Sequence, residues 1–556
     1  MSKRLAITIA GAVSLGSYEA GVLYEILAAI AAHNTDVRTT PEEKIYIDII
    51  TGASAGGMSS AILAQKLLFE GTSLAGQDSN ALHDPWINEI SLDQLLNHTS
   101  GDNPTHSVFS SQLIEKISRK YITSRYGNGP PPAPSPHPAI DRTKPLKLGL
   151  ALSNLDGIDY AKDLRTGGQF VYTRYQDELR RDFSLNPASD DPTLWEGVRN
   201  AAVACGAFPF AFAVKALQRT LAEYVEPVPS GFPPLNLRFA YTDGGVFQNE
   251  PLGMAKKFVD QIDRHLDTEN RFYLFIAPGA KDSTIATGPG APITDKTANF
   301  YQTAETLIEA IFYQARFQDW IMAEEVNLSV KVFNLRARQL MEELLNGSTT
   351  GSVIESAADS FLKVLEANAP TRITQQIIDD ALERLRSQFS DEYARLHGPE
   401  VPLGTATAWL KAIFVLELSA ELELYDEMNI FGITALNTEL AGSSLIAFAG
   451  FFDQKIRQHD YDVGRNKAKS FILAQNAAPQ GGLGPFRYDP GPPIYVDPAY
   501  ANFDPSKLSK NERKVLLDRL ASRADTLLQE AGVPGIIRWA AGLFYIRPML
   551  RKWLSL

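Results

Sequence analysis

Short apolar runs alternate with longer amphipathic segments through the first 280 residues of the chain. The apolar runs have the length of buried strands, and the segments between them follow the 3.6-residue period of helices. This alternation is typical of a mostly parallel sheet covered by helices on both faces, so we expect an α/β fold, a three-layer sandwich. Strands are predicted at residues 5–10, 44–51, 146–153, 237–241 and 271–277.

Proline and polar residues mark the surface segments of this region. Residues 129–138 contain six prolines, which exclude a helix or an inner strand and predict an exposed loop. The polar stretches at residues 71–80 and 184–192 predict further surface excursions.

From about residue 298 the pattern changes to long helical periodicity. Helical runs are predicted at residues 304–345, 352–368, 372–397 and 409–426. Residues 476–508 are rich in proline and glycine, and a final helix is predicted to begin at Ser509, where Glu512 completes a capping-box pattern. We expect four parts: an α/β domain at 1–345, a helical extension packed on it at 346–475, a connector at 476–508 and a helical tail at 509–556.

The composition is that of an ordinary folded protein, with 44% hydrophobic and 21% charged residues. The net charge of −12 argues against a nucleic-acid partner. The single cysteine, Cys205, excludes an intramolecular disulfide and favours a reducing compartment, so we expect a cytoplasmic protein with Cys205 in its core. The eight histidines show no metal-ligand spacing, and we expect neither a metal nor a cofactor.

The chain has no run of eighteen consecutive apolar residues, so the sequence predicts no transmembrane span. Residues 535–556 combine four basic residues with large apolar side chains and contain no acid. This composition suits a transient, peripheral membrane contact. A terminal helix docked on the core would have much the same composition.

A serine motif follows the predicted strand 44–51. Gly52, Ser54 and Gly56 form the pattern G-x-S-x-G, and a helix-like run begins at residue 57. A serine on a sharp strand-to-helix turn needs small neighbours, and the turn sets its hydroxyl at the positive end of the helix. This is the position of a nucleophile, although an ordinary Gly/Ser turn is the alternative.

Two further segments offer partners for this serine. Asp243 follows the predicted strand 237–241, and the pair Gly244 and Gly245 behind it lets another group approach the carboxylate closely. An ordinary Asp-Gly turn is the alternative. The first strand runs into a turn of small residues before a helix, whose unpaired N–H groups form an anion site. The candidate oxyanion donors are the backbone N–H groups of Gly11, Ala12, Val13 and Ser14.

These three segments, in this order, resemble the patatin-like phospholipase family. Its pattern is a glycine-rich oxyanion turn, then G-x-S-x-G, then D-G-G or D-G-A, and residues 148–157 and 201–209 are similar to two more of its segments. The resemblance implies a serine–aspartate dyad in which Ser54 is the nucleophile and Asp243 its general base. It also implies a lipid substrate whose carboxylic ester is cleaved, in the manner of a phospholipase A or lysophospholipase, through an acyl-enzyme.

The oxyanion turn departs from the family pattern, which usually has a basic residue where this chain has Leu15. Two of the family's glycine positions also carry side chains here. One alternative is therefore a catalytically weak interaction module that binds a partner protein. The other is an α/β-hydrolase with a Ser-His-Asp triad, for which only His265, His397 and His459 follow Asp243.

Overall fold

The computed structural model describes most of the chain, and it divides into two compact units. It describes residues 2–553 except 104, 128, 164–167, 225–227, 231–236, 264–269, 281–302, 304–317, 348–349, 369–373, 420–427, 444–446, 479–481, 502–505, 507 and 531. The first unit, here called the main unit, comprises Met1–Ala255, Phe272–Gln318 and Ile430–Leu556. The second, the helical unit, comprises Lys256–Arg271 and Asp319–Asn429.

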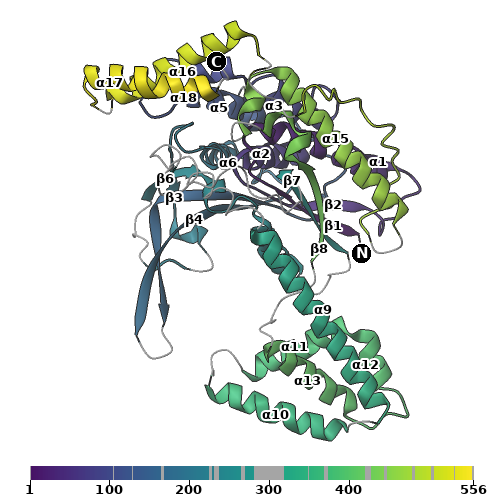
Figure 1. The fold of residues 1–556 in the computed structure, drawn as a ribbon. Helices are drawn as coiled ribbons and strands as arrows, with labels where there is room; N and C mark the ends of the chain where they lie inside the picture. The colour runs from purple at the N-terminus through teal and green to yellow at the C-terminus, as the bar shows by residue number, and fades with distance from the viewer. Residues whose placement is uncertain are drawn as a thin grey trace. The chain divides into compact units, whose positions relative to one another are not determined.

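The main unit is built on a mixed sheet of eight strands in the order β5-β6-β3-β2-β1-β7-β8, with β4 paired to β3 (Figure 1). The strands are β1 (Lys3–Ile9), β2 (Ile45–Gly52), β3 (Leu146–Asp163), β4 (Gln169–Phe183), β5 (Lys215–Arg219), β6 (Leu237–Asp243), β7 (Arg271–Ala280) and β8 (Asn429–Leu436). At the centre, β2 is parallel to both β1 and β3. The predicted α/β fold is confirmed, and the five predicted strands are present as β1, β2, β3, β6 and β7.

Three strands, β4, β5 and β8, were not predicted. β4 pairs antiparallel with β3 along its whole length, and its first five residues are all exposed. Because that half of β4 buries neither face, the alternation that reveals a strand in the sequence is weak there. β3 itself continues ten residues beyond the predicted end at residue 153 to pair with β4.

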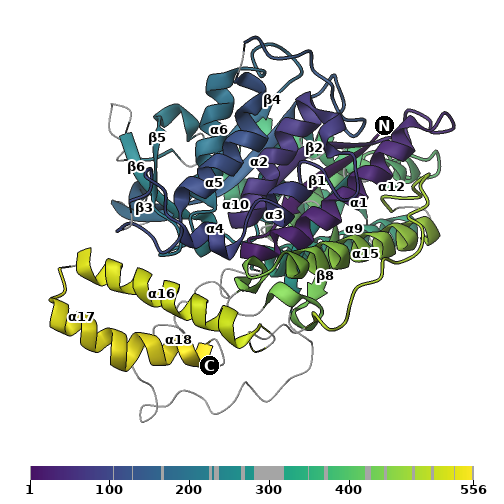
Figure 2. The ribbon, with the colours of Figure 1, turned by 90° about the horizontal axis from the view of Figure 1, so that it is seen from above.

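Helices cover the sheet. The helices that lie wholly in the main unit before the C-terminal tail are α1 (Gly16–Thr35), α2 (Ser54–Phe69), α3 (His83–Ile87), α4 (Leu92–Leu96), α5 (Ser111–Ser118), α6 (Pro192–Cys205) and α15 (Gln454–Ala477). Figure 2 shows α15, α1, α2 and α6 side by side in that order. The contacts of α1, α2 and α6 with β1, β2, β3, β5 and β6 place these three helices against the sheet.

α1 and α15 cross with their backbones in contact. A Cβ atom on Gly21 would lie 2.0 Å from the carbonyl oxygen of Tyr461, and one on Gly464 would lie 2.1 Å from that of Tyr18. Next to the crossing, Arg465 and Glu25 form a buried ion pair of 2.8 Å. α15 is therefore an integral part of the main unit, although it lies more than 400 residues from α1 in the chain.

α1 is an apolar helix, and most of it is buried in the core of the main unit. The helix Val13–Thr35 is long and apolar enough to span a membrane, and 78% of its most apolar window is buried inside the structure. Val22, Leu23, Ile26 and Ile30 are each fully buried. The central helix of a folded domain has the same length and apolar composition as this one, so these two properties do not identify α1 as a membrane span.

The helical unit has a core of its own. It contains α9 (Gln318–Leu345), α10 (Gly351–Asn368), α11 (Gln375–Gln388), α12 (Ser390–Leu396) and α13 (Thr405–Ser419), and α7 (Leu252–Asp263) begins in the main unit and ends in this one. Trp409 is fully buried at its centre with Leu385 and Phe389, and the Trp409 indole donates to the carbonyl oxygen of Ala337 at 2.9 Å. The predicted helical residues 304–317, 372–373 and 420–426 lie outside the described residues.

The predicted division into domains stays a prediction, and the compact units have different boundaries. α9 precedes the predicted boundary at 345, yet it packs with the helices that follow it. Residues 430–475 were predicted in the helical extension and belong to the main unit. After the connector come α16 (Lys510–Glu530), α17 (Gly535–Ala541), the π-helix η11 (Gly542–Ile546) and α18 (Arg547–Trp553).

Candidate active site

Ser54 lies at the junction between β2 and α2. Its φ is 51°, in the left-handed region that side chains rarely adopt, and it is the first residue of α2. The N–H of the preceding residue, Ala53, donates to the carbonyl oxygen of Ile9 on the neighbouring strand. The turn therefore carries local strain at the one residue whose hydroxyl it presents, which is a feature of functional sites.

The two predicted supporting glycines of this turn are required by close backbone approach. A Cβ on Gly56 would lie 2.3 Å from the carbonyl oxygen of Ala10, and one on Gly52 would lie 2.4 Å from that of Gly56. Cys205, fully buried, packs on the same helix start, because a Cβ on Gly57 would lie 2.3 Å from its sulfur. Burial raises the pKa of Cys205, so its thiol remains protonated in the core.

Asp243 lies at the end of β6 and faces Ser54. The Ser54 hydroxyl donates to Asp243 Oδ2 at 2.6 Å, and the N–H of Gly245 donates to Asp243 Oδ1 at 2.7 Å. Gly244 allows β3 to approach, since a Cβ there would lie 2.1 Å from the carbonyl oxygen of Ala151. Asp243 is fully buried, and this burial raises its pKa to about 7 although both hydrogen bonds lower it.

The predicted oxyanion turn lies between β1 and α1. The N–H of Gly11 donates to the backbone oxygen of Asn249 at 2.8 Å, so this donor is engaged. A short 3₁₀ helix, η1 (Val13–Leu15), follows, and Val13 has a φ of 51°. The N–H groups at the start of such a helix have no partner within it. Ser14 is fully buried, and Ala12 caps the 3₁₀ helix.

A hollow of about 590 Å³, here called the apolar cavity, adjoins Ser54. Apart from Ser54, its lining is apolar: Val13, Ala55, Met58, Pro85, Trp86, Ile90, Ile114, Ile117, Gly206, Phe208, Phe212 and Phe451. The cavity can hold an apolar group next to the serine hydroxyl.

The C-terminal part of the main unit fixes the turn that was predicted to hold the oxyanion. The Ser14 hydroxyl donates to the carbonyl oxygen of Ala447 at 2.5 Å and accepts from the N–H of Gly450 at 3.1 Å. Arg457 of α15 then donates to the carbonyl oxygens of Gly450 (2.9 Å) and Ile87 (3.0 Å). Arg457 therefore joins the segment that holds the turn to α3 on the cavity wall.

The Arg457 guanidinium is buried and its hydrogen bonds go to carbonyl oxygens, not to a carboxylate. Burial lowers its pKa to about 10, and Asp453 offsets part of this effect. A buried cation that bonds only to carbonyl oxygens is costly. We infer that it is retained for the position it gives to its two partners.

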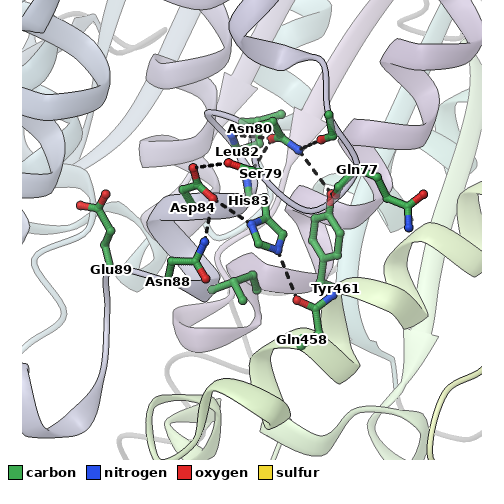
Figure 3. Close-up of polar contacts among 12 residues, drawn as sticks. Gln77, Ser79, Asn80, Leu82, His83, Asp84, Asn88, Glu89, Gln458 and Tyr461 are labelled. Atoms are coloured by element: carbon green, nitrogen blue, oxygen red, sulfur yellow. Dashed lines mark hydrogen bonds and ion pairs between the residues drawn. The ribbon is translucent and has the colours of Figure 1, made fainter.

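A polar network fixes α3, which carries Trp86 to the cavity wall (Figure 3). Nδ1 of His83 lies 3.0 Å from Asp84 Oδ1, and its Nε2 lies 3.2 Å from Gln458 Oε1 on α15. The ring of Tyr461, also on α15, meets the His83 ring edge-on at 4.8 Å. α15 thus supports both the predicted oxyanion turn and the cavity wall.

Sequence reasoning placed Ser54, Asp243 and the turn, and the structure brings all three together. It missed Arg457 and the segment 447–451, because nothing local in the sequence connects them with residue 14. Gly464 was the one residue that could have indicated the contact between α15 and α1, because it lies opposite the close approach at Gly21. Its role can be recognised only when the two helices are known to touch. Among the described residues, no group of three His, Cys, Asp or Glu side chains is arranged to hold a metal.

An α/β sheet with a serine on a strained strand-to-helix turn is an arrangement typical of serine hydrolases. Residues 7–256 match the sequence model of the patatin-like phospholipase family. The chain therefore contains a patatin-like phospholipase domain over these residues, and this domain supports the lipid acyl hydrolase family in general.

The curated relatives are uncharacterized. Over 318 residues the chain is 25% identical to the uncharacterized membrane protein Rv3479 of Mycobacterium tuberculosis, which covers 50% of this chain and 27% of that protein. Over 391 residues it is 22% identical to the uncharacterized protein y4iI of Sinorhizobium fredii, which covers 56% of this chain and 54% of that protein. The matches thus span about half, or less, of the length of these relatives.

Replacing Asp243 by asparagine should stabilise the fold at neutral and alkaline pH. The pKa of Asp243 is about 7 in the folded chain and about 4 in an unfolded one, so wild-type stability falls as the pH rises from about 4 to about 7. The amide of the introduced asparagine is always neutral and escapes this loss. We expect Asp243→Asn to gain on the order of 4 kcal/mol in urea unfolding at pH 8, with the gain vanishing near pH 4.

The exposed Asp78→Asn variant is the matched control for this experiment. A gain for Asp243→Asn that stays constant from pH 4 to pH 8 would show that charge burial is not its cause.

Replacing Arg457 by methionine should lower kcat by about a hundredfold, because a displacement of about 1 Å at the oxyanion donors has an effect of this size. Ser14→Ala removes the hydrogen bonds from the turn to Ala447 and Gly450, and it should also lower kcat. Steady-state kinetics on a short-chain ester would measure both. Lys455→Met, at an exposed position of the same helix, is the control; equal kcat values for Arg457→Met and this control, in proteins with native circular dichroism, would refute the positioning role.

Proposed function

We propose that the domain is a serine lipid acyl hydrolase of the phospholipase A or lysophospholipase type, working through a Ser54–Asp243 dyad. One observation carries the proposal: the 2.6 Å hydrogen bond from the Ser54 hydroxyl to a buried carboxylate, at the edge of an apolar cavity. A serine hydroxyl becomes a nucleophile when a base takes its proton. A carboxylate with a pKa of about 7 is a far stronger base than an ordinary one and is still about half ionised at neutral pH.

The proposed reaction has two steps. Asp243 accepts the Ser54 proton while Oγ bonds to the ester carbonyl carbon, and the N–H groups of Ala12, Val13 and Ser14 stabilise the oxyanion. Asp243 then gives this proton to the oxygen of the leaving alcohol, and the acyl group remains on Ser54. Water then loses a proton to Asp243 and attacks the acyl-enzyme, which releases the fatty acid and regenerates Ser54.

The triad alternative has less support. Both carboxylate oxygens of Asp243 have partners, Ser54 and Gly245. Of the candidate histidines, His397 is in the helical unit, and His459 is paired with Asp460 at 3.0 Å. His265 lies outside the described residues. Within the described chain, no histidine hydrogen-bonds to Ser54 or Asp243.

The interaction-module alternative rests on the atypical turn. Leu15 replaces the usual basic residue and is 3% exposed. The Leu15 side chain is part of the hydrophobic core of the main unit. Because oxyanion stabilisation comes from backbone N–H groups, which every residue of the turn except proline would supply, this replacement leaves the proposed chemistry intact.

Ser54→Ala should abolish hydrolysis of fatty acyl esters, a loss of at least about a thousandfold, because the nucleophile is absent. A fluorophosphonate probe should label the wild-type protein at Ser54, as seen by peptide mass spectrometry, and should not label Ser54→Ala. Cys205→Ser, whose thiol is buried, is a control that retains Ser54. Wild-type protein that neither takes up the probe nor hydrolyses esters would favour the interaction module.

We also propose that α17 and η11 contact an anionic membrane surface. Ile536, Trp539 and Leu543 form one stripe, with 83%, 67% and 48% of each residue exposed. The four basic residues of this tail and its lack of acids complement anionic lipid. α16, which leads into the tail, donates from Arg523 to the carbonyl oxygen of Ser107 near the site. The cytoplasmic location stays a prediction.

The double variant Ile536→Asp/Trp539→Asp should bind vesicles of anionic phospholipid about tenfold more weakly than the wild type, as measured by co-sedimentation. Raising the salt concentration should weaken wild-type binding as well. Val37→Asp, at a residue that is 99% exposed and lies outside the tail, is the control. Equal sedimentation of the double variant and the control would refute the membrane role of the tail.

A further inference from the structure

β4 is an edge strand of the sheet, because β3 is the one described strand that pairs with it (Figure 1). Ile158–Asp163 of β3 and Gln169–Arg174 of β4 form a two-stranded ribbon, here called the arm. Three consecutive apolar residues of β4, Phe170, Val171 and Tyr172, are 43%, 61% and 39% exposed. The arm therefore presents a strand edge and large apolar side chains on the surface.

The outer edge of β4 is covered towards its C-terminal end and open in the arm. Arg219 donates to the carbonyl oxygen of Glu178 at 2.9 Å, so a side chain closes the edge there. Backbone groups alternate in direction along a strand, so those of Tyr172 and Arg174 point to the same outer edge as those of Glu178. In the part of the chain that the structure describes, only β3 pairs with the backbone of residues 170–176.

This edge lacks the usual protection against pairing with another strand. Natural edge strands are short, or they carry lysine, proline or an inward-pointing charge. Residues 169–175 contain no proline and no lysine, and Arg174 is their one charged residue. The hydrocarbon of a membrane offers backbone N–H and C=O groups no hydrogen-bond partner, whereas a strand pairs with all of them. The edge therefore suits a strand and not a lipid surface.

We propose that β4 pairs antiparallel with β4 of a second copy of this chain, so that two sheets join across a two-fold axis. The inference is independent of the proposed hydrolase chemistry. A two-fold interface must be self-complementary. An axis at Tyr172 meets this condition, because it places Tyr172 opposite itself and Arg174 opposite Phe170. An axis at Arg174 would set two like charges against each other, which is unfavourable.

The aromatic side chains of the arm favour this register. The Tyr172 ring stacks on that of Tyr160, with 5.8 Å between the ring centres, and its centre lies 6.0 Å from that of Phe170. Pairing about Tyr172 joins two such clusters on one face of the joined sheets. The Arg174 guanidinium of each copy then lies next to the Phe170 ring of the other, where a cation–π contact adds to the attraction.

The pairing involves residues 169–175 of each copy. Seven residues a side make an interface at the small end of the range for protein complexes, so we expect a reversible dimer. Because the interface uses the same edge on both copies, it closes on itself, and association stops at the dimer.

Sedimentation velocity of the full chain tests its state of association. The share of dimer should rise between about 1 and about 100 µM, the range of reversible complexes with small interfaces. Monomers at every concentration would overturn the proposal, and so would assemblies larger than a dimer.

Tyr172→Cys tests the register. The two-fold axis brings the two introduced thiols opposite each other, with Cα atoms about 5.5 Å apart, which is within reach of a disulfide. Mild oxidation should therefore link two copies, as seen on a non-reducing gel. Gln169→Cys, at an exposed position of the same strand, is the matched control, because the two copies of residue 169 would lie ~20 Å apart. Cys205 is fully buried and does not compete.

Charge variants at the same position give a second test that needs no oxidation. Tyr172→Lys and Tyr172→Glu should each weaken the dimer about tenfold, because each loses the aromatic pair and sets like charges opposite each other. An equimolar mixture of the two should recover most of the loss, since lysine then faces glutamate. Val37→Lys, at a residue that is 99% exposed and lies outside the arm, is the control.

Three outcomes of the variant experiments would overturn the proposal. They are equal cross-linking of Tyr172→Cys and Gln169→Cys, wild-type dimerisation of both charge variants, and a mixture of these variants that associates no better than either alone. Native circular dichroism spectra of the variants exclude misfolding as the cause.

Discussion

The backbone contact between α1 and α15 at Gly21 and Gly464 is the constraint on which the proposed site depends. With any side chain at either glycine, the helices would have to separate by a distance that the buried Arg465–Glu25 pair, only 2.8 Å long, could not follow. The close contact sets the distance between α15 and α1, and this distance determines the position of Arg457. From there Arg457 reaches both Ile87 and Gly450, so helix packing fixes the segment that holds the turn at residues 11–14.

Two unfavourable features meet at the dyad, and the sheet holds both in place. Ser54 and Val13 each have a φ of 51°, and Asp243 is a carboxyl group with no exposed surface. The two positive φ angles cost free energy relative to a relaxed backbone, and the buried carboxyl group costs free energy relative to a solvated one. β1, β2 and β6 end at or just before these residues, so the central strands and their hydrogen bonds fix them before any ligand arrives. Placing strain and a buried acid together is how a fold makes an ordinary serine and aspartate reactive.

The sequence was most informative where the residues of the proposed site are close together in the chain or directly follow a strand. Gly52, Ser54, Gly56 and Asp243 each lie at or near a strand end, so strand prediction and motif together were enough to bring Ser54 and Asp243 to one place in the fold. β4 was missed because its exposed half lacks the pattern of burial that the prediction needs. The contacts of Arg457 and Ser14 were beyond prediction for another reason. They join segments whose proximity depends on packing, and a single sequence carries no trace of a contact between distant residues.

The hydrogen bond between Ser14 and Ala447 also determines when the site can first exist. Its partners are separated by 433 residues, with the helical unit between them. At roughly 5–20 residues per second, a ribosome needs ~20 s or more to make that span. Through most of its synthesis the nascent chain thus has a serine and an aspartate but an untethered oxyanion turn. Under the proposed function, the site is therefore complete only as translation nears its end.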